Sequence, residues 1–460
     1  MITPRPFQSD AVERHAQILT AGNSSGQCAS LEASVAGFGK TYVASFVAKQ
    51  LGHPMAVLCP KSVIPHWERA AAEVGVPVRF VTNYEQPRII VPMKIRGNRA
   101  QGVSPNTKEI NRIKAAKEAS FPHGKWLVRG KKYKWTVPKP TLLVFDECHR
   151  CKEMTTQNAK LLTAAATQNI PTLMMSATAA QDPLDMAAIG YRLGLHDGAD
   201  FLGWGHQYGV RRGNFGWEYQ GGPDDLKRLN GLLFPGHGHR KTFDDIPDFP
   251  STVIDTYPVS DDGAAMKIDA LYSHIKELEN LKGDAITEIT HRLRARQIAE
   301  MSKVPALVEL VQESCLAGNS AVVFFNFREP IAQFIRLMGA KVGEIGQIVG
   351  GQSTTAREDT VQAFQGNRTH CLVAQISAGG VGVNLHDIHA QRPRESFISP
   401  PDSARSLIQA LGRVRRDGGT PSIQHIMYLR GSVEERVRRA VEKKAHNISL
   451  LNDGDLDPLF

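Results

Sequence analysis

Residues 37–41 have the types and spacing of a loop that binds a phosphate chain. They read Gly37-Phe38-Gly39-Lys40-Thr41 and lie between an apolar run and a stretch of helical composition. Glycines let backbone N–H groups converge on phosphate oxygens, a lysine reaches the β- and γ-phosphates, and a hydroxyl ligates Mg²⁺. We expect these five residues to bind ATP, with Thr41 on the metal ion.

Two adjacent acids follow an apolar run further along the chain. Residues 142–145 read Leu-Leu-Val-Phe, and Asp146 and Glu147 come next. A buried strand that ends in carboxylates is how an α/β sheet presents catalytic groups beside a phosphate loop. Asp146 would hold Mg²⁺, mostly through water, and Glu147 would polarise the attacking water. Each motif alone could be an ordinary turn, but the two in this order favour an ATPase site in which Lys40, Asp146 and Glu147 are catalytic.

The runs around these motifs predict the elements that position them. Short apolar, β-rich runs alternate with helical stretches from about residue 7 to residue 195, and a second set begins near residue 303. This alternation favours parallel sheets covered on both faces. A chain of 460 residues also exceeds what one hydrophobic core organises. We therefore expect an α/β fold of two domains, residues 1–245 and 246–460, each a parallel sheet flanked by helices.

Two segments of the first domain differ from the rest in composition. Residues 200–245 are rich in glycine and aromatic residues, and we expect hairpins or irregular structure near a linker there. Residues 88–139 hold 14 basic and 2 acidic side chains, which predicts a basic insertion. Its second part alternates around Gly130 and predicts a β-hairpin, with Trp126 before the turn and Trp135 after it.

Aromatic residues interleaved with lysines in this hairpin suit a nucleic-acid surface. We expect contacts to nucleic acid from Lys131, Lys132 and Trp135. The alternative is a solvated basic excursion whose tryptophans only pack on the domain. The net charge of +9 permits a polyanionic partner without requiring one.

Composition excludes several other classes of protein. No apolar run approaches the ~20 residues that a membrane span needs, and the N-terminus lacks the basic and apolar regions of a secretory signal. Six scattered cysteines fit a reducing compartment better than a disulfide framework. Cys148 and Cys151 form a C-x-x-C that could serve redox chemistry or half a zinc site, but no second pair exists. We expect a cytoplasmic protein, bacterial or, if phage-encoded, in the host cytoplasm.

The motifs together resemble those of helicase superfamily 2, over nearly the whole chain. Arg5-Pro6-Phe7-Gln8 looks like the segment whose glutamine reads adenine. Ser176-Ala177-Thr178 looks like the motif that couples the ATP state to the grip on nucleic acid. Residues 378–385 resemble motif V, and the resemblance puts Gln8 and Gly382 at the ATP. It implies two tandem RecA-like domains with an ATP cleft between them, and ATP and Mg²⁺ as cofactors.

Residues 409–416, Gln-Ala-Leu-Gly-Arg-Val-Arg-Arg, match motif VI of the same superfamily. Charge that builds on the transferred phosphoryl group is stabilised by cationic forks. Arg413 and Arg416 are one helical turn apart and would face the same side of a helix. We expect Gln409, Arg413 and Arg416 to be catalytic, the two arginines as arginine fingers. The alternative is a solvated basic helix face.

Several stretches are similar to Swi/Snf-type members, in particular to an annealing-helicase-like branch with a DEAH-like box. Residues 59–68 are similar to motif Ia of that branch, and residues 214–229 and 239–247 to the annealing-helicase-like subgroup. Two departures limit the assignment: residues 398–401 read Ile-Ser-Pro-Pro in place of a Trp-Asn-Pro, and Gln375 stands where motif V usually begins with Ser or Thr. Branch-migration helicases stay open, and a minimal bacterial or bacteriophage member would fit.

The resemblance also implies a track for the phosphates of one nucleic-acid strand, although each residue on it could instead be plain scaffold. The residues expected on this track are Lys61, Ser62, Thr82, Ser176, Thr178, Ala378 and Gly379.

The function implied by the resemblance is an ATP-dependent translocase or helicase. It would be a nucleic-acid-stimulated ATPase that moves along duplex or branched DNA, in remodelling, annealing or branch migration, as in recombination and repair. We expect DNA as the partner ahead of RNA, no membrane, and a monomer. Two alternatives stay open: a strand-separating RNA helicase, and a non-catalytic nucleic-acid-binding protein with a relic nucleotide site.

Overall fold

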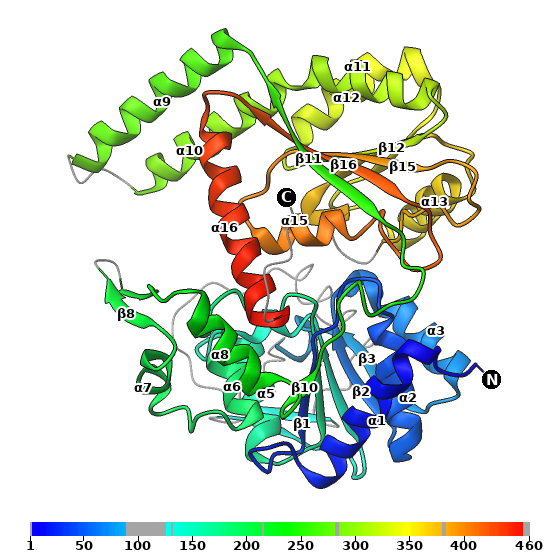
Figure 1. Ribbon diagram of the computed structural model, residues 1–460, viewed down its shortest axis with the longest axis vertical. Helices are drawn as coiled ribbons and strands as arrows, with labels where there is room; N and C mark the ends of the chain where they lie inside the picture. The colour runs from blue at the N-terminus through cyan, green and yellow to red at the C-terminus, as the bar shows by residue number, and fades with distance from the viewer. Residues whose placement is uncertain are drawn as a thin grey trace, which may run out of the picture. The chain divides into compact units, whose positions relative to one another are not determined.

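The chain folds into two compact units, each described here by itself (Figure 1). The computed structural model describes residues 2–88, 126–129, 132–213, 216–280, 285–379 and 383–453. Unit 1 comprises Met1–Val35, Gly39–Asp245 and Ile448–Asp455. Unit 2 comprises Ala36–Phe38, Ile246–Asn447 and Leu456–Phe460. None of the helices in the described ranges has both the length and the apolar character needed to cross a membrane.

Unit 1 is built on a six-stranded sheet in the order β10-β1-β7-β6-β2-β3. Every neighbouring pair of strands in it is parallel. Several of its strands are buried along their whole length, as expected for a parallel sheet covered on both faces. The strands are β1 Ala29–Glu32, β2 Met55–Cys59, β3 Val78–Asn83, β6 Leu142–Asp146, β7 Thr172–Met175 and β10 Gly238–His239.

Helices cover this sheet on both faces. The chain moves from β1 to β2 to β3 in one direction across the sheet and from β6 to β7 in the other, so right-handed crossovers put their helices on opposite faces. Figure 1 shows α1, α2 and α3 on one face and α5, α6 and α8 on the other. The helices of unit 1 are α1 Pro6–Ala21, α2 Lys40–Leu51, α3 Ile64–Val74, α5 Gln157–Thr167, α6 Ala187–Leu193, α7 Phe201–His206 and α8 Pro223–Leu233. Short 3-10 turns span η1 Lys61–Val63, η2 Gln86–Arg88, η3 Cys148–Cys151 and η4 Pro183–Met186.

The predicted hairpin near Gly130 is present as β4 Leu127–Arg129 and β5 Tyr133–Trp135, which pair antiparallel. Its aromatic residues do not face outward as a nucleic-acid surface would require. Trp135 is only 2% exposed, stacks on Phe80 at 6.3 Å between ring centroids, and donates its indole N–H to the carbonyl of Leu161 at 2.9 Å. The expectation that Trp135 contacts nucleic acid is wrong in this fold, because its ring belongs to the core. Residues 89–125 and 130–131 of the predicted insertion, Lys131 included, lie outside the described residues.

The segment 200–245 is more regular than predicted. It contains an antiparallel hairpin, β8 Val210–Gly213 with β9 Gly216–Tyr219, as its glycine and aromatic content indicated. It also contains helix α8, whose leucines at 226, 229 and 233 are buried, and strand β10, which extends the sheet beside β1. The expected linker is therefore an integral part of unit 1. A two-residue strand has no periodicity that could have predicted it.

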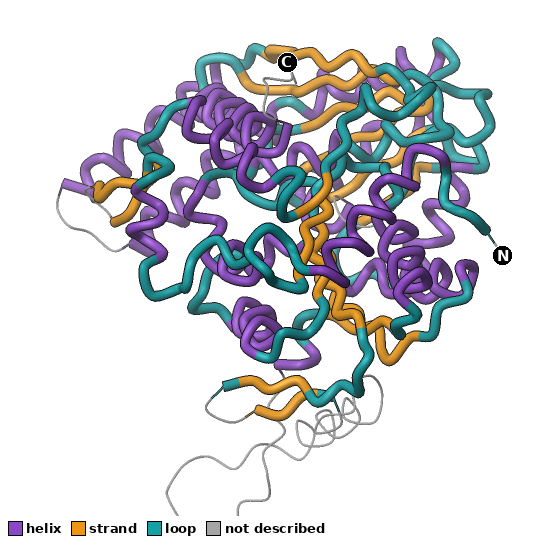
Figure 2. Tube along the Cα trace, turned by 60° about the horizontal axis from the view of Figure 1, so that its bottom comes forward, coloured by secondary structure: helices purple, strands orange, loops and turns teal. Residues whose placement is uncertain are grey.

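Unit 2 is a second parallel sheet, in the order β11-β16-β15-β12-β14-β13. Figure 2 draws the chain from a second direction, with strands in orange and helices in purple. The strands are β11 Thr252–Val259, β12 Ser320–Phe325, β13 Ile345–Ile348, β14 Cys371–Gln375, β15 Arg394–Ile398 and β16 Ser422–Leu429. The helices are α9 Asp262–Asn280, α10 Ala285–Ser302, α11 Val304–Leu316, α12 Arg328–Val342, α13 Thr354–Gln365, α14 Ile376–Gly379, α15 Ala404–Leu411 and α16 Val433–Asp453. The prediction of an α/β chain with parallel sheets flanked by helices is confirmed.

A histidine between two carboxylates joins three strands of unit 2. His425 on β16 bonds Asp255 on β11 through Nδ1 at 2.6 Å and Glu395 on β15 through Nε2 at 2.8 Å. Burial alone would lower the pKa of His425, but the hydrogen bonds and charges of Glu395 and Asp255 raise it above 6.5. A histidine whose pKa is higher folded than unfolded stabilises the fold fully below the unfolded pKa, and the stabilisation is lost as the pH rises through the folded pKa.

Replacing His425 with glutamine is expected to destabilise unit 2 more at pH 6 than at pH 9, because glutamine keeps a polar amide but cannot carry the proton. Melting temperatures of the wild type and the variant, measured by calorimetry at both pH values, test this. His206→Gln is the control, since that exposed side chain lies in unit 1. An equal loss at both pH values would show that the charge of His425 is irrelevant.

Candidate nucleotide-binding site

The phosphate-binding loop predicted at residues 37–41 lies between β1 and α2, as its sequence indicated. Gly37 and Gly39 have φ values of 96° and 84°, a region that favours glycine. A Cβ atom on Gly39 would lie 2.5 Å from the side-chain nitrogen of Gln8, so the amide of Gln8 lies directly against the loop. Helix α2 begins at Lys40 and its first backbone N–H groups are unsatisfied within the helix, which suits an anion.

Lys40 is held in place by the backbone just before this loop. Its ammonium donates hydrogen bonds to the carbonyl oxygens of Ser34 at 2.7 Å and Val35 at 2.9 Å. Ser34 stands at the position where the strict phosphate-loop pattern has a glycine, and its carbonyl thereby takes part in positioning the lysine. The cation is thus directed over the loop, where a phosphate chain would lie.

The two acids lie at the same edge of the sheet as the loop. In the parallel register of strands, Met175 of β7 pairs with Asp146 of β6 on one side and with Glu32 of β1 on the other. The carboxyl ends of β1 and β6 therefore lie at the same edge of the sheet, with β7 between them. Open α/β sheets bind their ligands at this edge. Glu147 adopts a left-handed backbone conformation, φ 53° and ψ 51°, which costs a non-glycine residue about 1 kcal/mol. Such strain is typical of residues held in place for function.

The carboxylate of Asp146 accepts hydrogen bonds from two donors and lies next to another acid. One carboxylate oxygen accepts the indole N–H of Trp67 at 2.9 Å, and the other accepts the backbone N–H of Glu147 at 3.0 Å. Burial and the charge of Glu147 raise the pKa of Asp146 to about 7, against the opposing effects of the Trp67 hydrogen bond and the Lys40 charge. A buried carboxylate beside a second one is stabilised by a cation, so these residues fit the expected Mg²⁺ ion.

The segment Ser176-Ala177-Thr178 follows β7 and touches the second acid. The hydroxyl of Ser176 lies 3.3 Å from a carboxylate oxygen of Glu147 and 3.0 Å from Nδ1 of His149. His149 itself lies 3.2 Å from the same oxygen of Glu147. The three side chains form one cluster, so a movement of residues 176–178 would act directly on the acid expected to activate water.

The residues expected to contact nucleic acid differ in how far they are exposed to solvent. Ser176, Thr178 and Thr82 are each 1% exposed. Their side chains are thus buried within unit 1, and the hydroxyl of Ser176 lies beside Glu147. Contact of these three residues with nucleic acid stays a prediction. Lys61 and Lys132 are exposed, Ser62 is half-buried in η1, and Ala378 is buried in α14 just before Gly379. The lysines are thus the expected contacts that remain accessible.

Motif VI of the sequence lies in unit 2 and is folded differently from the expectation. Helix α15 ends at Leu411, so Gln409 is helical whereas Arg413 and Arg416 follow in a turn. The reasoning that both arginines share one helix face is wrong, because the helix ends before the first of them. Arg413 is instead tied to the loop after α14: its guanidinium donates to the carbonyls of Gln409 at 2.9 Å and Val383 at 3.2 Å. Gly382, expected at the ATP, lies outside the described residues.

Sequence reasoning missed the residues that support the two acids. Trp67 and Tyr84 are fully buried aromatic residues, and Tyr84 donates its hydroxyl to the backbone carbonyl of Asp146 at 2.7 Å. Nothing in the sequence around them distinguishes a core aromatic residue from one that orients a carboxylate. Cys148 and Cys151, considered for redox or zinc chemistry, are buried free thiols in η3.

Trp67→Phe is expected to raise the Mg²⁺ concentration needed for half-maximal ATP hydrolysis by about 10- to 100-fold, the usual effect of losing a residue that orients a metal ligand. Phenylalanine keeps a smaller aromatic ring in the core, but the donor to Asp146 is lost. A Mg²⁺ titration of ATPase activity measures the change. The matched control is Trp204→Phe, a buried tryptophan of the same unit outside this cluster. Equal Mg²⁺ requirements in both variants would contradict the role given to Trp67.

Comparison with known proteins gives one family match. Residues 302–418, in unit 2, match the model of the Helicase conserved C-terminal domain. The chain is similar to "Putative ATP-dependent RNA helicase L364" of Acanthamoeba polyphaga mimivirus, at 29% identity over 454 residues, 93% of this chain and 80% of that protein. It is also similar to "Putative ATP-dependent helicase/translocase YwqA" of Bacillus subtilis (strain 168), at 27% identity over 163 residues, 34% of this chain and 16% of that protein.

Among solved structures, the chain is similar to S. cerevisiae Dbp5 bound to RNA and ADP BeF3. The identity is 12% and the TM-score 0.49, with 97% of this chain and 88% of that chain covered.

Proposed function

We propose that this protein is an ATP-dependent motor of helicase superfamily 2 that moves along nucleic acid. The observation that carries the proposal is the meeting of parts of three motifs at one sheet edge of unit 1: Lys40 of the phosphate loop, the acids Asp146 and Glu147, and the Ser176 segment in contact with Glu147. The match of residues 302–418 to a helicase C-terminal domain supports it independently, because it falls in the other unit.

The roles follow from the chemistry of phosphoryl transfer. Backbone N–H groups at the start of α2 and the ammonium of Lys40 bind the phosphates, and Gln8, packed against Gly39, is placed to read the base. Thr41 and Asp146 would hold Mg²⁺, which neutralises charge on the β- and γ-phosphates when bound. Glu147 orients and polarises the attacking water. Arg413 and Arg416 of unit 2 are proposed to stabilise charge on the same γ-phosphate, so that hydrolysis requires both units.

We further propose DNA, duplex or branched, as the track, and translocation as the activity. The similarity of residues 59–68 to motif Ia of Swi/Snf-type motors supports DNA. The similarity to YwqA, which is named a helicase/translocase, supports translocation. RNA is the second candidate, because the relative that aligns with 93% of the chain is named an RNA helicase. Exposed Lys61 and Lys132 would contact phosphates in either case, so binding should tolerate sequence and weaken with salt.

ATPase rates separate these candidates when measured with no nucleic acid and with single-stranded, duplex, forked and four-way DNA and single- and double-stranded RNA of equal length. Stronger stimulation by duplex or branched DNA than by RNA is expected. If RNA stimulated the ATPase more strongly than DNA, RNA would be the track. If no nucleic acid changed the rate of ATP hydrolysis, the proposal of a nucleic-acid motor would be contradicted. An unwinding assay on forked duplexes then distinguishes strand separation from translocation.

A further inference from the structure

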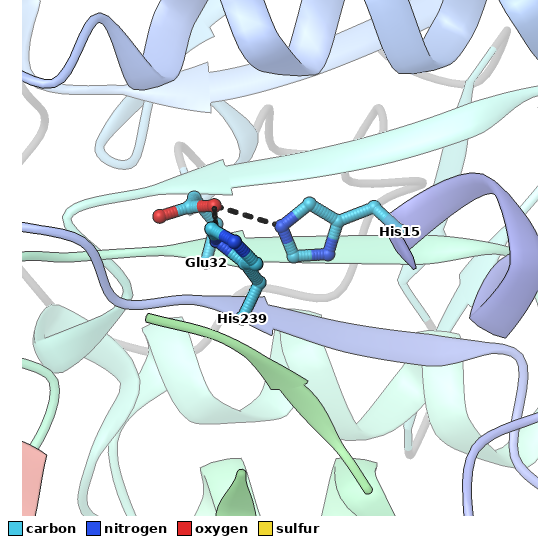
Figure 3. A group of neighbouring side chains, drawn as sticks. All are labelled: His15, Glu32 and His239. Carbon is cyan, nitrogen blue, oxygen red and sulfur yellow. Dashed lines mark hydrogen bonds and ion pairs between the residues drawn. The ribbon is translucent and has the colours of Figure 1, made fainter. Parts of the chain in front are cut away.

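Three side chains that are remote in the sequence converge behind the phosphate loop of unit 1. His15 lies on α1, Glu32 ends β1, and His239 ends β10. Because β10 pairs with β1 in parallel with Glu32 opposite His239, these two side chains leave the sheet on the same face. Figure 3 shows both imidazole rings turned toward the carboxylate of Glu32.

The ligand-type atoms of this cluster face one another. One carboxylate oxygen of Glu32 lies 2.9 Å from Nε2 of His15 and 3.2 Å from Nδ1 of His239. The set of one oxygen and two nitrogens falls within 4.8 Å. The other carboxylate oxygen accepts the backbone N–H of Ser34 at 2.7 Å, so the carboxylate is fixed in orientation.

Glu32 is fully buried, and one of its carboxylate oxygens lies within hydrogen-bond distance of both imidazole rings. An interior carboxylate must be matched by positive charge. That charge can be a proton on one imidazole or a metal ion held by all three groups.

The outer nitrogens of both rings have partners of their own. Nδ1 of His15 lies 2.7 Å from the hydroxyl of Ser30. Nε2 of His239 lies 3.7 Å from a carboxylate oxygen of Asp10, which Lys241 holds by an ion pair of 2.9 Å. Metal-binding histidines characteristically have the second ring nitrogen engaged by a hydroxyl, carbonyl or carboxylate, which fixes the ring with its other nitrogen toward the metal.

We propose that His15, Glu32 and His239 form a binding site for a transition-metal dication of the Zn²⁺ type. Two imidazoles and a carboxylate are a donor set that such ions take in preference to Mg²⁺. Tetrahedral bonds of about 2.0–2.2 Å would separate the ligand atoms by roughly 3.3–3.6 Å. The two observed separations are slightly shorter and would open by a small rotation of the rings. The fourth position would be taken by water, or by the hydroxyl of Ser34, which lies 3.5 Å from Nδ1 of His239.

This site is separate from the Mg²⁺ position at Asp146 and its role is structural. It joins α1, which carries Gln8, to the strand that leads into the phosphate loop and to the edge strand β10. A bound ion would therefore fix the helix and the loop on which the nucleotide depends. ATP hydrolysis itself does not involve this ion.

The test uses the full chain without a histidine tag, purified without chelator. Elemental analysis by mass spectrometry is expected to find about one zinc per chain, or the chelator-stripped protein to regain one equivalent. Zn²⁺ at about a hundredfold excess over its Kd should raise the melting temperature of the stripped protein by at least about 4 °C. Co²⁺ in place of zinc should give the visible absorption of a tetrahedral nitrogen–oxygen site. A wild-type protein that holds no metal and does not respond to Zn²⁺ or Co²⁺ would overturn the proposal.

Variants locate the ion. His239→Ala and the isosteric Glu32→Gln are expected to lose the metal and the thermal response, whereas His206→Ala, a change to an exposed histidine, keeps both. His239 is the first choice because its ring is partly exposed, so its replacement disturbs the core least. If either variant fails to fold, the wild-type measurements still decide. Retention of metal by a folded His239→Ala protein would also overturn the proposal.

Discussion

Replacing Glu147 with glutamine is expected to lower the kcat of ATP hydrolysis by at least about 100-fold, the usual contribution of a general base. The amide keeps the size of the side chain and can still bond Ser176, but it cannot polarise water. ATP binding should survive, because the phosphate loop and Lys40 are unchanged. Steady-state ATPase rates and calorimetric titration with a non-hydrolysable ATP analogue measure the two effects separately.

The control for Glu147 is Glu153→Gln, an exposed acid a few residues later in the same segment. Its ATPase rate should match that of the wild type. If Glu147→Gln kept its activity, the water-activating role would have to move to another group, and the assignment of the site would be wrong.

Replacing Glu434 with glutamine is expected to lower the free energy of unfolding of unit 2 by about 3–5 kcal/mol, the usual cost of removing one partner from a buried ion pair. Both oxygens of Glu434 lie 2.8 Å from the ammonium of Lys303, and both side chains are buried. The ammonium also bonds the carbonyl of Met427, and the backbone N–H of Leu429 donates to Glu434. The variant would leave an interior lysine charge without its counterion. Urea unfolding measures the loss.

Two further variants identify the cause of this loss. Glu435→Gln changes the neighbouring acid of the same helix, which pairs with Arg439 at the surface and should cost less than about 1 kcal/mol. The double variant Lys303→Met with Glu434→Leu should recover most of the stability, since it removes both charges. A double variant as unstable as Glu434→Gln would show that shape, and not the unpaired charge, is responsible.

Local patterns in the sequence were sufficient to predict the parallel sheets and the phosphate loop. The run Leu142–Asp146 is apolar and ends in an acid, so its own residues predict a buried strand with a polar end. The hairpin at Trp126 and Trp135 was predicted for the same reason, from its alternation. The burial of its tryptophans could not be predicted, because alternation alone does not show which face of the hairpin packs on the core. That face is decided by contacts with Phe80 and α5, which are distant in the sequence.

The parts that could not be predicted depend on contacts between distant segments. Asp146 is oriented by Trp67, and Glu32 meets His239, across separations that no spacing rule encodes. Strand β10 is too short to have a period and forms because β1 offers an unpaired edge. The end of α15 at Leu411 was missed because the prediction continued the helix through Gly412, a residue of low helix propensity at which the helix ends.

The central claim is that Arg413 and Arg416 take part in ATP hydrolysis as arginine fingers, and single-turnover hydrolysis tests it most directly. Arg413→Lys and Arg416→Lys keep the charge but lose the guanidinium fork, and Arg415→Lys, whose arginine bonds Pro250 within unit 2, is the control. We predict that ATP binds normally to all three variants and that the rate falls about 1,000-fold in the first two only. Rates within a factor of about two of the wild type in both would contradict the claim, because unit 2 would then contribute nothing to the chemistry.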